Sequence, residues 1–353
     1  MNLNELDMIV SVSRKTDIPA FYADWFFNRL EAGFVLYKNP FNANQVHRVE
    51  LTPENVDAFV FWTRNPQPFI SRLDLLEPYI YYFQYTITGY PRYLEKSTPN
   101  PYKAIETFKN LSRIIGRERV IWRYDPILLS NTLTIQEHKR LFSKIADLLN
   151  GYTDKVVISF ADFYKKTERN LKSVQIPIKS ENTISKFEFF NILDKEFEDN
   201  LKELVLFMKN VAKENGMTIE TCSEEIDLKI RYGIEITHGK CIDNELLEKI
   251  AHKKGFPSKK DKGQRQACGC VESRDIGIYD TCVHGCQYCY ATTQHDKATE
   301  NKKKHNPESP FLLGDFPTSF TDEQRAEKLK PPSLKISKLS VNEQPSLFDL
   351  LDM

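Results

Sequence analysis

The chain lacks a net charge, because its 49 lysine and arginine residues balance 49 aspartate and glutamate residues. A neutral protein gains no long-range attraction to nucleic acid or to an acidic membrane surface, so any polyanion it binds must meet a local basic patch. The sequence also lacks any stretch that approaches the roughly 18 consecutive apolar residues of a membrane span. We therefore expect no membrane-spanning segment.

The first residues, MNLNELDMIVSVSRKTD, lack the cationic start and the long apolar run of a signal peptide. We therefore expect a cytoplasmic protein, in which structural disulfides are rare. Cysteine is scarce, at seven in 353 residues, yet it is clustered. Clustered thiols in a reducing compartment more often bind metal or carry out redox chemistry.

Short apolar runs alternate with amphipathic stretches along most of the chain. Strands are predicted at 8–13, 56–66, 79–89, 119–126, 155–163 and 217–224, and helices at 20–33, 101–116, 134–151 and 196–216. Strands that alternate with helices pair in parallel, and near-continuous apolar strands indicate that both faces of the sheet are covered. About seven such units favour an α/β fold with a closed or partly open TIM-like β/α barrel.

The character of the sequence changes after Ala251. Residues 251–266 are basic and polar and are predicted to form a loop, and DIGIYD at 275–280 predicts a short strand. We expect residues 1–292 to form the barrel, with a cysteine-rich part at 217–292. Residues 293–353 lose hydrophobic periodicity and predict an extended or partly disordered tail.

The segment TCVHGCQYCYA places Cys282, Cys286 and Cys289 in a Cys-x3-Cys-x2-Cys pattern. Three thiolates are one fewer than a tetrahedral metal site or an iron–sulfur cluster normally uses. A zinc site completed by His284 or His295 is the alternative, although Cys-x2-Cys pairs are more typical of zinc. We expect His284 to be a solvent-facing loop residue rather than a ligand.

This spacing resembles that of the radical SAM superfamily, and CQYCY resembles its spore photoproduct lyase branch. The whole chain is similar to a bacterial family in which such cysteines stand at the C-terminal end. The resemblance implies that Cys282, Cys286 and Cys289 hold a [4Fe–4S] cluster whose fourth iron is chelated by S-adenosylmethionine (SAM). Tyr288 stands where the superfamily usually has an aromatic residue, and it is implied to border the cofactor.

The resemblance also implies an activity. The reduced cluster would cleave SAM to a 5′-deoxyadenosyl radical that abstracts hydrogen from a substrate, with an electron donor such as flavodoxin or ferredoxin. In ordinary members the cysteine loop follows the first barrel strand, whereas here it follows 275–280. If 8–13 forms the neighbouring strand, the barrel is circularly permuted, and we find no glycine-rich SAM motif after the strand that would then be second.

The other four cysteines are Cys222, Cys241, Cys268 and Cys270, the number of ligands in a complete [4Fe–4S] cluster. A second cluster is one interpretation, and a four-cysteine zinc site or scattered buried thiols are the others. Cys268 and Cys270 lie in a polar, glycine-containing segment, which is unusual for buried spare thiols.

Polar residues follow most of the predicted strands, at the end where barrel active sites lie. Arg14, Arg64 and Arg123 would suit an anionic substrate or the carboxylate of SAM. The alternative is that Arg14–Asp17 and Arg123–Asp125 are structural ion pairs. The full set is Ser13, Arg14, Thr16, Asp17, Thr63, Arg64, Asn65, Thr86, Thr88, Arg123, Asp125, Ser159, Asp162, Glu220, Glu224 and Glu225, with Arg14, Asp17, Arg64, Arg123, Asp125 and Glu220 as the catalytic candidates.

Two further segments suggest partners. Residues 34–51 interleave basic and aromatic side chains, which suits nucleic acid, but a β-hairpin on the barrel rim is the favoured interpretation. Gln344, Leu347 and Phe348 in QPSLF (344–348) resemble the peptide with which bacterial repair proteins bind the sliding clamp. We therefore favour damaged or modified nucleic acid as the substrate. One alternative is a radical SAM enzyme that modifies peptides with the help of an auxiliary cluster. The other is a non-catalytic iron–sulfur or zinc protein that binds nucleic acid.

Overall fold

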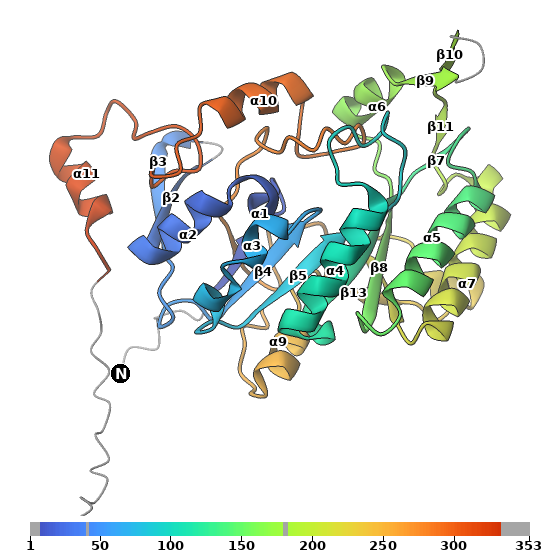
Figure 1. Cartoon of the computed structure of the whole chain (residues 1–353), viewed down its shortest axis with the longest axis horizontal. Coiled ribbons are helices and arrows are strands. Elements are labelled where there is room, and N and C mark those ends of the chain that lie inside the picture. The colour runs from blue at the N-terminus through green and yellow to red at the C-terminus, as the bar shows by residue number, and fades with distance from the viewer. Residues whose placement is uncertain (1–7, 40–41, 179–182, 333–353) are drawn as a thin grey trace, which may run out of the picture.

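An eight-stranded, entirely parallel sheet organises the chain (Figure 1). The structure is a computed structural model, and it describes residues 8–39, 42–178 and 183–332. In spatial order the strands are β13 (Thr237–Gly239), β12 (Thr218–Cys222), β8 (Lys155–Phe160), β6 (Val120–Ile127), β5 (Tyr81–Thr86), β4 (Ala58–Thr63), β1 (Ile9–Val12) and β14 (Arg274–Asp275).

The central strands are rich in aromatic and β-branched residues, which suit a pleated surface that is covered on both faces. Strand β4 reads AFVFWT and β5 reads YYFQYT, and nearly all of these side chains are buried. One face carries Phe59, Phe61, Phe83 and Trp122, which belong to the large hydrophobic core. The alternation therefore places every second residue of each strand on the opposite face.

The helices cover the face that carries the large core. Three long ones, α4 (Pro101–Ile115), α5 (Ile135–Leu149) and α7 (Glu198–Glu214), lie next to one another along the sheet (Figure 1). Helix α4 begins after Asn100, whose side chain accepts from the backbone N–H of Tyr102, and α5 begins after Thr134, which caps it in the same way. All three confirm helices predicted from amphipathic periodicity, as do the two short helices α1 (Ile18–Phe21) and α2 (Ala23–Ala32).

The opposite face of the sheet is covered by the cysteine-rich part of the chain. Helix α9 (Asn244–Ala251) places Leu247 and Ile250 against strand residues such as Val60 and Tyr82. Cys241, Cys268, Cys270 and Val271 belong to the same hydrophobic cluster. The predicted loop at 251–266 contains no helix beyond Ala251, the last residue of α9.

The order of the strands bears directly on the predicted barrel. From β1 through β4, β5, β6, β8 and β12 to β13 the chain advances in one direction across the sheet, and β14 is added beyond β1. The predicted pairing of the last strand with residues 8–13 is confirmed, since Val10 pairs with Arg274 and Ser11 with Asp275. Within the described residues, however, β13 and β14 do not pair, so the observed fold is an α/β fold with an open parallel sheet.

The segment after residue 292 differs from its prediction. It contains α10 (His295–Lys303) and α11 (Asp322–Leu329), and it packs on the hairpin of β2 (Phe34–Asn39) and β3 (Asn42–Glu50), which lies beside it in Figure 1. Phe311 is 1% exposed against the hairpin, and Arg48 donates to the backbone carbonyls of Lys328 and Lys330. The tail prediction is therefore wrong for residues 293–332, whereas the clamp-like peptide at 344–350 lies outside the described residues.

Smaller elements complete the described part of the chain. They are α3 (Gln67–Ile70), η1 (Leu73–Leu76), η2 (Arg117–Arg119), β7 (Leu129–Ser130), α6 (Lys165–Lys172), β9 (Gln175–Ile178), β10 (Thr183–Lys186), β11 (Phe189–Phe190), η3 (Lys195–Phe197) and α8 (Leu228–Tyr232). Across the described residues, no helix combines the length and apolar character needed to cross a membrane.

Candidate functional site

A cavity of 460 Å³ lies at the carboxyl ends of the parallel strands. All seven cysteines of the chain line this cavity, although they are spread along the sequence from Cys222 to Cys289. Carboxyl ends of strands are where α/β proteins place their ligand sites. A cavity of this volume is in the range that holds a small molecule or cofactor.

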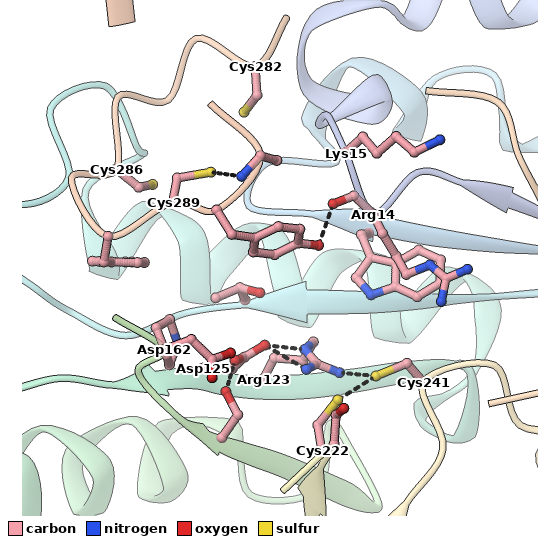
Figure 2. Close-up of a pocket in the computed structure, with 18 of the residues that line it drawn as sticks. Arg14, Lys15, Arg123, Asp125, Asp162, Cys222, Cys241, Cys282, Cys286 and Cys289 are labelled. Carbon is pink, nitrogen blue, oxygen red and sulfur yellow. Dashed lines mark hydrogen bonds and ion pairs between the residues drawn. The ribbon is translucent and has the colours of Figure 1, made fainter. Parts of the chain in front are cut away.

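Cys282, Cys286 and Cys289 lie on the loop that follows β14, on one side of the cavity (Figure 2). Gly285 allows this loop to turn, because its φ of +69° is a value that residues with a side chain rarely adopt. Burial raises the pKa of the Cys282 thiol, and it raises the pKa of Cys286 to about 12 against the lowering effect of Arg64. Without a bound cation, the thiols of Cys282 and Cys286 are therefore protonated at neutral pH.

Asp17 fixes the cysteine loop to the start of the sheet. Its Oδ1 accepts from the backbone N–H of Ala20 at 3.0 Å, and its Oδ2 accepts from the backbone N–H of Arg64 at 2.7 Å. The same Oδ2 lies 2.7 Å from Nε2 of His284, so that nitrogen donates to it. His284 is 2% exposed, and the prediction that it faces solvent is wrong because this carboxylate compensates its burial.

Tyr288 belongs to a second buried network beside the loop. Its hydroxyl accepts from Arg64 at 2.6 Å and donates to Glu95, and Arg64 also donates to Glu95 at 2.9 Å. Glu95 in turn accepts from Thr88 at 2.6 Å. The guanidinium of Arg64 is therefore neutralised by a carboxylate that the sequence analysis did not single out.

Arg14 is held at the edge of the cavity by two aspartates. Its guanidinium lies 3.4 Å from Asp261 and 3.9 Å from Asp275, rather than beside Asp17 as the ion-pair alternative proposed. Asp275 also accepts from Ser11 and Ser13, each at 2.7 Å. These contacts join β14 to β1 through side chains as well as through the backbone.

Arg123 connects the middle of the sheet to the second group of cysteines. It donates to Oδ2 of Asp125 at 2.7 Å and to Sγ of Cys241 at 3.0 Å (Figure 2). Burial acts to raise the pKa of Asp125, but Arg123 and Ser159 lower it below the ordinary value. The Arg123–Asp125 ion pair that was one interpretation of the sequence is thus present, and its cation also faces a sulfur.

Cys222, Cys241, Cys268 and Cys270 form a continuous chain of contacts on the side of the cavity away from the loop cysteines. Sγ of Cys222 lies 2.8 Å from Sγ of Cys241. Cys241 also lies near Cys270, and Cys270 near Cys268, close enough for these thiols to change one another's pKa values. The pKa of Cys268 is lowered to about 7 by Cys270, whereas the pKa values of Cys222, Cys241 and Cys270 are raised.

Most of the polar residues predicted from strand ends meet in this cavity. Of that set, Asn65, Thr88, Glu220 and Glu225 do not line it. Glu220 shares a face of β12 with Cys222 but lies one layer deeper, where it pairs with Lys155 at 2.8 Å. Glu224 does line the cavity, and burial raises its pKa to about 8.

The sequence analysis missed several residues of the cavity and its supports. Arg265 lines it from the 251–266 loop and pairs with Asp162, while Tyr164 and Tyr279 stand at its entrance, 43% and 44% exposed. The basic character of the loop was the available signal for Arg265. Nothing in the local sequence marks Glu95 or Asp261, because their partners lie far away along the chain.

Most of the chain matches a known family. Residues 9–291 match the family described as a domain of unknown function, DUF1848. The chain belongs to this family. The matched part runs from β1 through all seven cysteines, and it ends before the C-terminal segment that packs on the hairpin. Comparisons with curated proteins and with solved structures found no match.

Within the described ranges, no three His, Cys, Asp or Glu side chains converge as they would around a single metal ion. The thiols of each group lie near one another and line one cavity, but they do not surround one point. The assignment of metal to either group is therefore a proposal.

Proposed function

We propose that the protein is a radical SAM enzyme. The observation that carries this proposal is that Cys282, Cys286 and Cys289, spaced Cys-x3-Cys-x2-Cys, face one cavity at the carboxyl edge of a parallel sheet. These three thiols would hold a [4Fe–4S] cluster and leave one iron without a protein thiolate. When bound, the cluster would pass an electron to SAM and release the 5′-deoxyadenosyl radical that abstracts hydrogen from the substrate.

The residues around the loop suit such a group. Three soft thiolate donors are the ligands that iron–sulfur clusters take. Burial raises the pKa of Cys286, and Arg64 acts against it, so this cation would help to stabilise the thiolate of a bound cluster. Thr16 lines the same cavity, and its buried hydroxyl has no hydrogen-bond partner among the described residues. A buried hydroxyl without a partner is costly, and a ligand in the cavity would satisfy it.

The strand order supports a permuted β/α barrel. Strand β14 lies beside β1 at one edge of the sheet, and the cysteine loop follows β14. In this order β14 corresponds to the first strand of the ordinary superfamily arrangement, and β1 to the second. Chain termini of compact domains often lie close together, which makes such a permutation physically inexpensive.

The protein's own residues would hold the reacting groups and exclude water. Asp17 and His284 fix the loop, the Tyr288–Arg64–Glu95 network closes the cavity behind it, and all of these residues except the partly exposed Arg64 are buried. Because Arg64 and Arg123 are paired with carboxylates, they act as positioning residues. Preorganised, buried polar groups of this kind keep a cofactor oriented without reorganisation during the reaction.

The entrance of the cavity favours a nucleic-acid substrate. The exposed rings of Tyr164 and Tyr279 stand there, with the cation of Arg265 near the first and those of Lys15 and Lys166 near the second. Aromatic faces that alternate with cations stack on bases and bind phosphates. This arrangement is local, so it is compatible with a neutral chain.

Formation of 5′-deoxyadenosine tests the activity. The protein, reconstituted with iron and sulfide and reduced without oxygen, is expected to make 5′-deoxyadenosine from SAM. The Cys282→Ala/Cys286→Ala/Cys289→Ala variant is expected to make none while keeping its far-ultraviolet circular dichroism. Failure of the wild-type protein to form product, with its cluster intact, would rule out this activity and favour a non-catalytic metalloprotein.

Binding of a fluorescent single-stranded oligonucleotide tests the substrate class. The Tyr164→Ala/Tyr279→Ala variant is expected to bind roughly tenfold or more weakly, since stacking contributes about 1–3 kcal/mol per base. Tyr102→Ala is the matched control, because Tyr102 is also exposed and lies under a cation, that of Lys144, but does not line the cavity. Equal binding by all three proteins would direct attention to a peptide substrate.

A further inference from the structure

We propose that Cys222, Cys241, Cys268 and Cys270 hold a second, fully ligated [4Fe–4S] cluster. The inference stands on its own observations and does not depend on the activity proposed for the loop cysteines. The four residues come from three separate parts of the chain: the end of β12, the residue after Lys240 that follows β13, and the loop after α9. The fold nevertheless brings their sulfurs into one chain of contacts.

Two of these sulfurs accept hydrogen bonds from buried or backbone donors. Arg123, which is 4% exposed, donates to Sγ of Cys241 at 3.0 Å. The backbone N–H of Ile242 donates to Sγ of Cys270 at 3.4 Å. A neutral buried thiol behaves as a small hydrophobe and needs no such donors, whereas the sulfurs of an iron–sulfur cluster carry charge and accept hydrogen bonds.

Ligation of a metal group would require these thiols to be ionised. Burying several thiolates together is costly unless they are paired or coordinate a metal. Arg123, the cation beside Cys241, is already shared with Asp125 at 2.7 Å and with Gln84 at 3.2 Å. One shared guanidinium would offset little of the charge of four thiolates, so the four would ionise together only with a metal group to compensate them.

The pattern favours a cluster over a single zinc ion. Structural zinc sites are typically built on Cys-x2-Cys to Cys-x4-Cys pairs, whereas the only close pair here, Cys268 and Cys270, is separated by one residue. A [4Fe–4S] cluster takes four thiolates, one on each iron, which matches the number of cysteines here.

Four thiolates would give this cluster a different role from the loop site. Every iron would carry a protein ligand, so none would be open to SAM or substrate. The site lines the same cavity as the loop cysteines, with Arg123 and Asp125 beside it (Figure 2). We therefore assign it either to electron transfer or to stabilising the fold at the cavity wall. A cluster that transfers electrons must be reducible in the folded protein, which distinguishes the two roles.

Iron and acid-labile sulfide content, with zinc measured on the same samples, test the proposal. The wild-type protein reconstituted without oxygen is expected to contain about eight irons per chain, and Cys268→Ala/Cys270→Ala about four. The Cys282→Ala/Cys286→Ala/Cys289→Ala variant is also expected to retain about four. Electron paramagnetic resonance of the reduced wild-type protein should then show two components, one of which each variant lacks.

The outcomes separate this inference from the activity proposed above. About four irons in wild type, unchanged in Cys268→Ala/Cys270→Ala and lost in the loop variant, would overturn the second cluster and leave the loop site standing. The reverse pattern would overturn the loop site instead. About one zinc per chain that disappears in Cys268→Ala/Cys270→Ala would replace the cluster by a zinc site and overturn the proposal as stated.

A milder variant guards against loss of folding. Arg123→Lys keeps the positive charge but shortens the reach of the donor to Sγ of Cys241. The iron content is expected to stay at about eight, while the reduction potential of one component moves to a more negative value, because hydrogen bonds to sulfur raise cluster potentials. A full iron content with both potentials unchanged would show that Cys241 is not a ligand.

Discussion

Replacement of Asp17 by alanine provides the sharpest test of how the cysteine loop is held. The carboxylate of Asp17 is 6% exposed and takes part in three hydrogen bonds, to the backbone N–H of Ala20, to that of Arg64 and to Nε2 of His284. The first is a helix cap, whose loss costs about 1 kcal/mol. Hydrogen bonds to a charged group contribute about 1.5–3 kcal/mol each, so Asp17→Ala is expected to cost about 4–7 kcal/mol in the free energy of unfolding.

Equilibrium unfolding in urea, followed by tryptophan fluorescence without oxygen, measures this cost through the midpoint at an unchanged slope. Asp24→Ala is the matched control on the next helix, because Asp24 pairs with Arg72 at 2.7 Å but its side chain is 78% exposed. That surface pair is worth about 0–1 kcal/mol. A cost for Asp17→Ala no larger than that of the control would refute the reasoning. It would also be refuted if the cost of the double variant Asp17→Ala/His284→Ala equalled the sum of the two single costs, because residues that interact do not contribute independently.

Three further predictions concern other parts of the fold. Burial lowers the pKa of His138 to about 4, whereas a histidine in the unfolded chain titrates at about 6.5. The contribution of neutral His138 to the free energy of unfolding is therefore fully present above pH 6.5 and is lost as the pH falls towards 4, by about 2 kcal/mol between pH 7 and pH 5. His138→Gln should remove that part of the pH dependence of urea unfolding. Gly285→Ala is expected to cost about 1–2 kcal/mol in thermal unfolding, because φ is +69° and a Cβ would lie 3.0 Å from Nδ1 of His295; an unchanged midpoint would contradict the turn. Phe311→Ala is expected to cost about 3–5 kcal/mol in urea, against less than 1 kcal/mol for the 36% exposed Phe190→Ala, and equal costs would contradict the packing of the C-terminal segment.

The elements that the sequence predicted well are those whose signal is local. Apolar runs and amphipathic periodicity define strands such as β4 and helices such as α5, and caps such as Thr134 mark their ends. The pairing of β14 with β1 was also predicted, because the cysteine loop resembles one that follows a first strand. These predictions use neighbouring residues and need no knowledge of distant contacts.

The predictions that failed depend on partners far along the chain. In the sequence His284 is a polar loop residue, but the carboxylate of Asp17, 267 residues away, offsets the cost of its burial through a hydrogen bond. Residues 293–332 have little hydrophobic periodicity, yet Phe311 anchors them on the hairpin and Arg48 binds their backbone. Glu220 was placed at the end of its strand, but the cavity begins only at Cys222, one layer further on.

The seven cysteines illustrate both cases. Spacing alone predicted a site at Cys282, Cys286 and Cys289, since the three lie within eight residues. That the other four meet one another depends on how the chain passes from β12 through β13 to the loop after α9, which the sequence does not show. That both groups line one cavity is visible only in the folded chain.

The central claim is that the loop cysteines leave one iron open for SAM. Electron paramagnetic resonance of the reduced, reconstituted protein with and without SAM tests it most directly. The claim predicts that SAM changes the spectrum of one component in the wild-type protein and in Cys268→Ala/Cys270→Ala, and changes nothing in Cys282→Ala/Cys286→Ala/Cys289→Ala. A wild-type spectrum that SAM leaves unaltered, with iron present at the loop, would contradict it.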